Sequence, residues 1–303
     1  MGQLTGRVAV VTGAARGIGR AVATLYATEG ASVHLLDRLE DELAAVCESI
    51  RGASGSAEPH GLDLRRPEAI ASTFAAIEAS EGPIDVLVNN AGVIFFKPVE
   101  ATSVEDWDWM HEINLRAPFL CCRAVAPGMK ARRSGSIINV SSNAGVRGGV
   151  DESAYCATKF GIEGLSRALA LELGAYNIAV NSITPGHPVH TAMSETTYGQ
   201  EQRRIWKDPI EIAPAFVHLA LQDASGLHDQ YVKAWDLTCR LREGAAAGGG
   251  ERDDERPMSV AGRTRRGGAV DARIEVPESA KTGALEDAPE ARAKGEHDDT
   301  SHI

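Results

Sequence analysis

The sequence contains little of what several protein classes require. Its 303 residues hold 31 Lys and Arg against 42 Asp and Glu, a net charge of −11, which argues against nucleic acid as a partner because phosphate binding needs a basic face. No apolar run approaches the roughly 20 residues of a membrane-spanning helix, so we expect no membrane partner. No basic-then-apolar leader precedes the first predicted strand. Five cysteines without disulfide or metal-ligand spacing indicate reduced thiols in a cytoplasmic protein.

Aromatic residues are absent from the last fifth of the chain. Residues 241–303 contain no Phe, Trp or Tyr, and hold 10 basic and 14 acidic residues among many Ala and Gly. Such a composition cannot bury enough apolar surface to offset the entropy lost on ordering. We therefore expect a disordered acidic tail at 241–303 and a single folded domain at 1–240.

Strand and helix patterns alternate along residues 1–240. Apolar, often β-branched runs predict buried strands at 7–12, 32–36, 84–88, 136–140 and 179–183, with weaker strands before Asp63 and near 230–235. Helical patterns lie at 17–29, 39–50, 67–80, 104–130, 153–174 and 210–221, and residues 191–207 look less regular. Continuous apolar strands that alternate with helices predict an α/β fold with a parallel sheet covered on both faces. Ligands of such sheets bind beyond the carboxyl ends of the strands, where polar residues of this sequence gather.

A glycine-rich turn follows the first predicted strand and opens a helix. Its spacing is Gly-x-x-x-Gly-x-Gly, with Arg16 inside the turn and glycines at Gly13, Gly17 and Gly19. Backbone N–H groups and the helix dipole at such a turn form a site for a pyrophosphate. Glycines let the backbone approach that group closely.

Asp37 ends the second predicted strand, 18 residues after Gly19. A carboxylate there can bind both hydroxyls of an adenosine ribose and would repel a 2′-phosphate. This position favours NAD over NADP. Arg16 and Arg38 leave NADP open, because a nearby guanidinium could accept the phosphate.

Tyr155 and Lys159 lie four residues apart in a predicted helix, so their side chains share a face. A free phenol, with a pKa of about 10, is a poor base near neutrality. A neighbouring ammonium favours the phenolate and lowers that pKa, which suits general acid–base transfer to an alcohol or carbonyl oxygen. Ser142, at a predicted strand end, can donate to a developing alkoxide.

These motifs occur in the order and spacing of a known family. The matching residues are Thr12-Gly13-x-x-x-Gly17-Ile18-Gly19, Asn89-Asn90-Ala91-Gly92, Asn114, Ser142, Tyr155-x-x-x-Lys159 and Pro185-Gly186. Over about residues 4–221 the sequence resembles the short-chain dehydrogenase/reductase family, in its shorter, single-domain branch. The resemblance implies a Rossmann-like, doubly wound sheet of about seven parallel strands. It also implies hydride transfer between a nicotinamide and a carbonyl or secondary alcohol.

The resemblance further implies roles for single residues. Tyr155 would be the catalytic acid/base, Lys159 would lower its pKa and hold the nicotinamide ribose, and Ser142 would bond the substrate oxygen. Asn114 would hold a water that links Lys159 to bulk proton transfer. Other implied cofactor contacts are Ile18 at the pyrophosphate or nicotinamide, Asp63 and Leu64 at the adenine, and Asn90, Ala91 and Gly92 along the cofactor channel.

Two parts of the sequence depart from the family pattern. The stretch from Pro185-Gly186 to the expected carboxamide contact is one residue longer than usual, which makes Val189 and Thr191 the candidates for that contact. The usual C-terminal strand ending is replaced by residues 226–237, so the oligomer geometry stays open. His187 and His190 have no carboxylate or cysteine partner nearby, so we expect no metal site.

We therefore predict an NAD-dependent oxidoreductase that interconverts a secondary alcohol and a ketone. Residues 143–152 and 187–208 should contact the substrate, whose identity and direction of reaction stay open. A stripe of small residues predicts a close helix contact, and the resemblance favours a homodimer or homotetramer; the stripe is Ala154, Ala157, Gly161, Gly164 and Ala168. The alternatives are a non-catalytic dinucleotide-binding regulatory or scaffold protein, and an isomerase or dehydratase that retains NAD.

Overall fold

Seven parallel strands form the sheet of the computed structural model, which describes residues 2–247. The strand order is β3-β2-β1-β4-β5-β6-β7. The strands are β1 (Val8–Thr12), β2 (Ser32–Asp37), β3 (Ser56–Gly61), β4 (Val86–Asn89), β5 (Gly135–Val140), β6 (Ile178–Thr184) and β7 (Tyr231–Lys233). Every residue of β1, β4 and β6 is buried, as expected for a parallel sheet with both faces covered. The predicted Rossmann-like α/β fold is confirmed.

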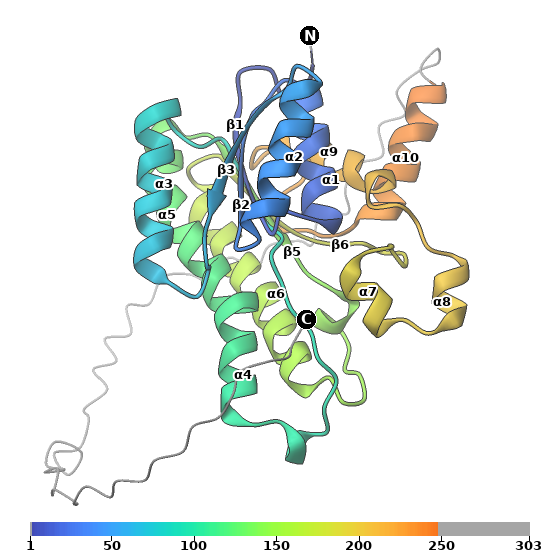
Figure 1. Cartoon of the computed structure of the whole chain (residues 1–303). Helices are drawn as coiled ribbons and strands as arrows, with labels where there is room; N and C mark the ends of the chain where they lie inside the picture. The colour runs from blue at the N-terminus through green and yellow to red at the C-terminus, as the bar shows by residue number, and fades with distance from the viewer. Residues whose placement is uncertain (1, 248–303) are drawn as a thin grey trace, which may run out of the picture. The chain divides into compact units, whose positions relative to one another are not determined.

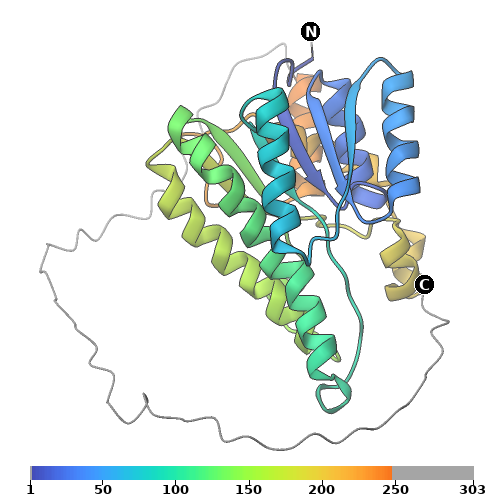
Figure 2. The same cartoon turned by 60° about the vertical axis from the view of Figure 1, so that its left-hand side comes forward.

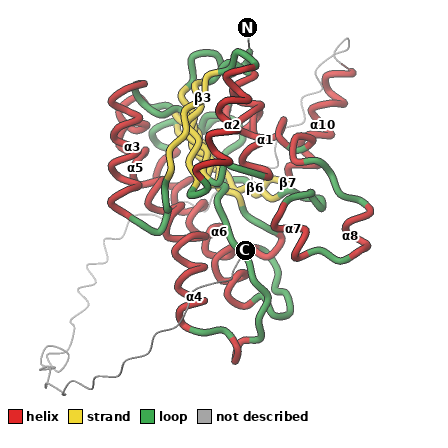
Figure 3. The backbone as a smooth tube through the Cα atoms, in the orientation of Figure 1, coloured by secondary structure: helices red, strands yellow, loops and turns green. Residues whose placement is uncertain are grey.

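Helices cover both faces of the sheet, as the red and yellow tubes of Figure 3 show. They are α1 (Gly17–Thr28), α2 (Glu40–Gly52), α3 (Pro67–Glu81), α4 (Val104–His111), α5 (Ala117–Arg132), α6 (Ser153–Gly174), α7 (Ala192–Thr197), α8 (Gln200–Arg204), α9 (Ala213–Ala220) and α10 (Ala234–Ala247). Local sequence starts several of them. Pro67 occupies the first turn of α3, and Ser103 caps α4 through a reciprocal pair of hydrogen bonds with Asp106.

Two hydrophobic cores lie on the two faces. The first joins the sheet to α1, α2, α9 and α10, and Tyr26 of α1 donates a hydrogen bond from its hydroxyl to the Phe216 carbonyl, 2.9 Å away. The second joins the other face to α3, α5 and α6, with Phe74, Met129 and Leu173 among its buried side chains. The turned view of Figure 2 shows the sheet between these two groups of helices.

The strand order reverses between β1 and β4, so the loops that follow these strands leave toward opposite faces. Such a switch point opens a crevice at the carboxyl edge of the sheet. In Figure 1, α7 and α8 lie beyond that edge, as does the lower part of α4 and α6. The fold therefore brings the predicted site residues to one edge.

Three segments differ from the sequence prediction. The helix predicted for 104–130 is interrupted by a π-helical turn, Glu112–Arg116, and residues 191–207 contain α7 and α8. Helix α10 was not predicted, and the domain boundary expected after residue 240 falls inside it, because its apolar face packs on α9. Residues 248–303 of the expected tail lie outside the described residues. Among the described helices, none has both the length and the apolar character that crossing a bilayer requires.

Candidate active site

The glycine turn after β1 has the conformation that its sequence predicts. Gly13 and Gly17 have φ angles of +66° and +59°, which side-chain-bearing residues rarely adopt. A Cβ on Gly19 would lie 2.1 Å from the Gly13 carbonyl oxygen, so only glycine allows the turn to close. No described side chain caps the start of α1, which leaves its first N–H groups free to bind an anion.

Asn90 and Thr12 fasten this turn to β4. The Asn90 side-chain amide donates to the carbonyls of Thr12 and Gly13 at 3.0 and 3.1 Å. In return, the Thr12 hydroxyl accepts hydrogen bonds from the backbone N–H groups of Asn90 and Ala91 at 3.0 and 3.1 Å. Asn90 therefore shapes the floor of the predicted cofactor channel from beneath, and the half-buried Ala91 lies beside it.

Asp37 lies at the end of β2, next to the glycine turn. One carboxylate oxygen accepts from the Ala15 N–H at 3.1 Å, and the other accepts from the Leu39 N–H at 3.2 Å. These bonds hold the carboxylate half-buried at the rim where a ribose would lie. Arg16 and Arg38 are both exposed, so their guanidinium groups are free to turn toward the same rim.

Asp63 and Leu64, predicted beside the adenine, follow β3. Asp63 is engaged by Arg65, whose guanidinium lies 2.7 Å from the carboxylate. Hydrogen bonding with Arg65 lowers the pKa of Asp63, with a smaller contribution from the charge of Arg38. The Leu64 side chain is buried in the core under α3, which leaves only its backbone for an adenine.

Ser142, Tyr155 and Lys159 converge at the carboxyl end of β5. The Lys159 ammonium lies 5.6 Å from the centre of the Tyr155 ring, one helical turn away on α6. It donates a hydrogen bond to the Val140 carbonyl at 3.0 Å, which ties α6 to the strand that Ser142 follows. The structure thus brings the three predicted catalytic side chains together.

Burial governs the ionisation of this pair. Burial lowers the pKa of Lys159 to about 8, and the charge of Glu163 partly opposes that shift. Burial also raises the pKa of Tyr155 above its ordinary value, although hydrogen bonding with Ser142 lowers it in part. The sequence predicts that a neighbouring ammonium lowers the phenol pKa; in the free chain burial is the largest influence on that pKa, and burial raises it.

Asn114 lies in the π-helical turn and is buried. Its side-chain oxygen accepts from the Val93 N–H, and its amide donates to the Val93 carbonyl, both at 2.8 Å. A Cβ placed on Gly92 would lie 3.4 Å from the Asn114 oxygen and 3.8 Å from the Lys159 nitrogen. The missing side chain at Gly92 therefore keeps the space between Asn114 and Lys159 clear, and Asn114 holds the backbone that borders it.

The Pro185-Gly186 loop continues this edge of the site. Gly186 has a φ of +73°, and the Pro185 carbonyl accepts from the Trp235 N–H at 3.0 Å. Of the two carboxamide candidates, Val189 is buried in the core. Thr191 instead reaches the glycine turn, since its methyl group would lie 3.3 Å from a Cβ on Gly17. Ile18, on the first turn of α1, is only partly buried and packs against the same core.

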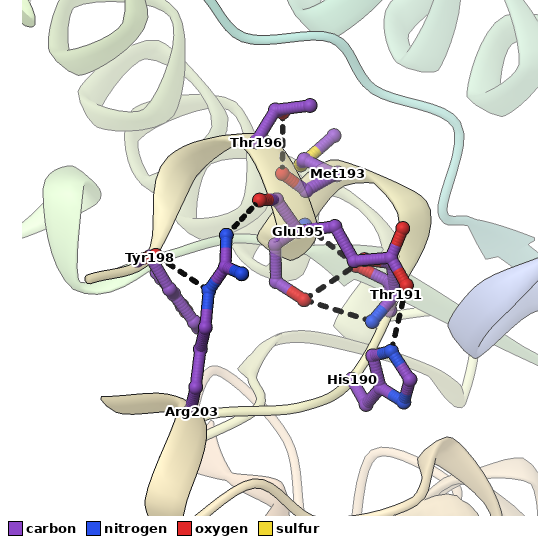
Figure 4. Close-up of polar contacts among 8 residues, drawn as sticks. His190, Thr191, Met193, Glu195, Thr196, Tyr198 and Arg203 are labelled. Atoms are coloured by element: carbon purple, nitrogen blue, oxygen red, sulfur yellow. Dashed lines mark hydrogen bonds and ion pairs between the residues drawn. The ribbon is translucent and has the colours of Figure 1, made fainter. Parts of the chain in front are cut away.

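The segment from His190 to Arg203 follows β6 and contains α7, and Figure 4 shows its polar contacts. The imidazole of His190 lies 2.8 Å from the Glu195 carboxylate, a partner that the sequence analysis did not expect and that the first turn of α7 supplies. Arg203 donates to the Tyr198 carbonyl at 3.0 Å and also to the Glu195 carbonyl. A cavity of about 430 Å³ lies between this segment and α1. It is lined by Arg16, Gly17, Arg20, Ala21, Thr24, His190, Thr191, Ala192, Glu195, Asp208, Pro209 and Ile210.

Tyr198 and Glu152 extend the site from the two segments expected to contact the substrate. Both contribute to the raised pKa of Tyr155, after burial as the largest cause. The sequence missed Tyr231 of β7, whose hydroxyl donates to the Ser142 carbonyl at 3.3 Å. No local pattern reveals that contact, because it depends on the pairing of β7 at the far edge of the sheet.

Comparisons with known proteins agree with this geometry. A family model described as short chain dehydrogenase matches residues 7–202. D-threitol dehydrogenase of Mycolicibacterium smegmatis is 39% identical over 183 residues, which are 60% of this chain and 70% of that protein. Cyclopentanol dehydrogenase of Comamonas sp. is 36% identical over 238 residues, covering 75% and 95%.

Solved structures give the same result. The crystal structure of a metagenomic short-chain oxidoreductase in complex with NADP is 38% identical, with a TM-score of 0.67, and the match covers 76% of this chain and 97% of that one. Fold, motif order and sequence identity agree: the chain belongs to the short-chain dehydrogenase/reductase family, whose members are oxidoreductases that bind a nicotinamide dinucleotide.

Proposed function

We propose that this protein is an NAD-dependent oxidoreductase that interconverts a secondary alcohol and a ketone. The observation that carries the proposal is the convergence of Ser142, Tyr155 and Lys159 at the carboxyl edge of the sheet, with the Lys159 ammonium 5.6 Å from the Tyr155 ring. A purely dinucleotide-binding scaffold does not require a buried tyrosine beside a buried lysine, and burying the lysine costs stability; such groups cluster at functional sites.

In the direction of oxidation, the Tyr155 oxygen would take the proton of the substrate hydroxyl. The Ser142 hydroxyl would donate to the same oxygen as negative charge develops on it. A bound nicotinamide would supply the acceptor for the hydride of the substrate carbon. Because burial raises the pKa of the phenol in the free chain, formation of the phenolate depends on positive charge beside it, which Lys159 supplies.

Lys159 can carry that charge. Its pKa of about 8 keeps it mostly protonated at neutral pH, yet close enough to neutrality to release a proton. The gap beside Gly92 and Asn114 gives the ammonium a neighbouring polar space. We propose that Asn114 is a positioning residue that keeps this route for protons open.

The residues of the predicted cofactor site fit a nicotinamide dinucleotide. The uncapped start of α1 and the left-handed glycines leave a cradle for a pyrophosphate. The Asp37 carboxylate at the end of β2 favours a ribose with a free 2′-hydroxyl, and hence NAD. NADP stays the alternative, since a solved relative holds it and two exposed arginines flank the site.

Two variants test the proposal. Tyr155→Phe should lower turnover in a screen of alcohols and ketones by about 10³-fold or more while NAD still binds, and retained turnover would overturn the role of the phenol. Asp37→Ser should shift the ratio of kcat/KM values for NAD and NADP toward NADP. An unchanged ratio would show that Asp37 does not select the cofactor. Ser141→Ala lies beside the site residue Ser142 but outside the proposed site, so it should change neither turnover nor the cofactor ratio and serves as the control.

We also propose that the protein acts on a small-molecule substrate as a homodimer or homotetramer. Part of the small-residue stripe serves the chain itself, because a Cβ on Gly161 would lie 2.7 Å from the Leu115 side chain, whereas Gly164 faces open space. The nearby Phe119 and Phe160 are 46% and 49% exposed. Such a face suits a second copy of the chain, and sedimentation analysis would give its copy number.

A further inference from the structure

A group of metal-ligating side chains lies on the sheet away from the active site. His34 of β2 pairs in register with Glu58 of β3, and His60 follows two residues later on the same strand. Since alternate residues of a strand point to the same face, all three side chains share the face that α3 covers. Their ligand atoms all lie within 4.8 Å of one another. Within residues 2–247, this is the one group of three such residues.

The two imidazoles are already in contact. The His34 Nδ1 lies 2.9 Å from the His60 Nε2. Two nitrogens bound to a tetrahedral zinc ion at about 2.0–2.1 Å lie about 3.3 Å apart, so the rings need to separate by only a few tenths of an ångström. Glu58 is exposed, and its side chain is free to swing toward the pair. The geometry is therefore close to a three-ligand site with an open fourth position.

The environment also suits a metal. Burial lowers the pKa of both histidines, which keeps them neutral, the form that binds a metal ion. The charges of Glu58 and Glu81 oppose that shift at His34. Glu81, at the end of α3, is held nearby by a hydrogen bond from Ser32 at 3.2 Å. Among the described residues, the buried Nε2 of His34 has no hydrogen-bond partner.

We propose that His34, Glu58 and His60 bind one zinc ion, with water as the fourth ligand, which fastens the edge strand β3 to β2. Two imidazoles and a carboxylate form a donor set typical of zinc. A metal ion would stabilise the pairing of this edge strand, which is weakly held: most of its side chains are at least partly exposed, and Pro59 lacks an N–H group. Strand β3 leads directly to Asp63, so the ion would also steady the adenine end of the proposed cofactor site.

Calorimetric titration of the full, chelator-treated chain with zinc chloride tests this inference without relying on turnover. We expect a site of one zinc per chain with micromolar or tighter affinity, and a melting temperature that rises by roughly 5 °C at saturating zinc. His60→Gln should weaken that affinity at least tenfold and abolish the thermal shift. Glu58→Gln should weaken the affinity less, because both histidines remain and the carboxamide oxygen can still bind zinc weakly. His111→Gln, on α4, should change neither and is the matched control.

Cobalt provides a second readout that does not depend on the variants. Cobalt(II) bound by the wild-type chain should show the intense visible absorption of a tetrahedral site. Added zinc should displace the cobalt and remove that absorption. Zinc binding no tighter than millimolar, or equal affinity in the wild type and a folded His60→Gln variant, would overturn the proposal. The two histidines would then share only a hydrogen bond. Neither result depends on whether the protein oxidises alcohols.

Discussion

Lys159 should make the stability of this protein depend on pH in a definite direction. Burial lowers its pKa from 10.5 to about 8, so between these values the unfolded chain binds more protons than the folded one. Stability therefore rises with pH across this window and falls as pH drops through about 8, because folding must then bury a charge. Replacing the residue by Met keeps the length of the side chain and removes the charge.

The size of the effect follows from the two pKa values. Between about pH 7.5 and pH 9.5, the contribution of Lys159 to the free energy of unfolding should rise by about 2 kcal/mol. Urea unfolding of the wild type and Lys159→Met at both pH values measures it as the difference between their changes. Lys130 is partly exposed, with its ammonium over the Tyr176 ring. Lys130→Met should therefore show the same change of stability between the two pH values as the wild type. Equal pH dependence in the wild type and Lys159→Met would refute the claim that this ammonium is buried at a cost.

Three other substitutions follow from the site geometry. Gly19→Ala should destabilise the protein by about 4 kcal/mol or prevent folding in urea titrations, because its Cβ would lie 2.1 Å from a carbonyl oxygen; Gly52→Ala at the end of α2, where a Cβ meets no other atom, should be harmless. Asn90→Ala removes two hydrogen bonds to the glycine turn and should cost about 1–3 kcal/mol of stability, with weaker dinucleotide binding by fluorescence titration. Tyr231→Phe removes the donor to the Ser142 carbonyl and should lower kcat several-fold while KM for the dinucleotide stays unchanged; an unchanged kcat would make that contact incidental.

Local sequence was sufficient to predict the sheet and the meeting of Ser142, Tyr155 and Lys159 at one edge of it. Runs such as 8–11 and 86–88 are apolar throughout, and a chain can bury such a run on both sides only inside a covered parallel sheet. Tyr155 and Lys159 are one helical turn apart in any helix. Their meeting with Ser142 required only that β5 and α6 be consecutive and adjacent, as short connections make them.

Contacts between distant segments could not be predicted. The sequence places Asn90 at the cofactor channel, but it could not show that its side chain bonds to the turn after β1, because the neighbouring positions of β1 and β4 bring the two together. Helix α10 packs on α9 in a region where the sequence departs from its family. The pairing of His34 with Glu58 depends on the register of two strands that are separated by a whole helix.

The pKa of Tyr155 is the clearest example of a property that residue spacing alone cannot predict. A lysine four residues away predicts a lowered phenol pKa, because charge attraction depends on that one distance. Desolvation depends instead on everything that surrounds the ring, including Ala144, Ala154 and the partly buried Phe95 and Trp109 of the same cluster. Those residues come from four separate segments, so their combined effect exists only in the fold. The same burial that raises the pKa of the free phenol would strengthen the electrostatic interaction of the phenol with any charge placed beside it. A charged ligand should therefore shift the ionisation of this site more than it would shift that of an exposed tyrosine–lysine pair.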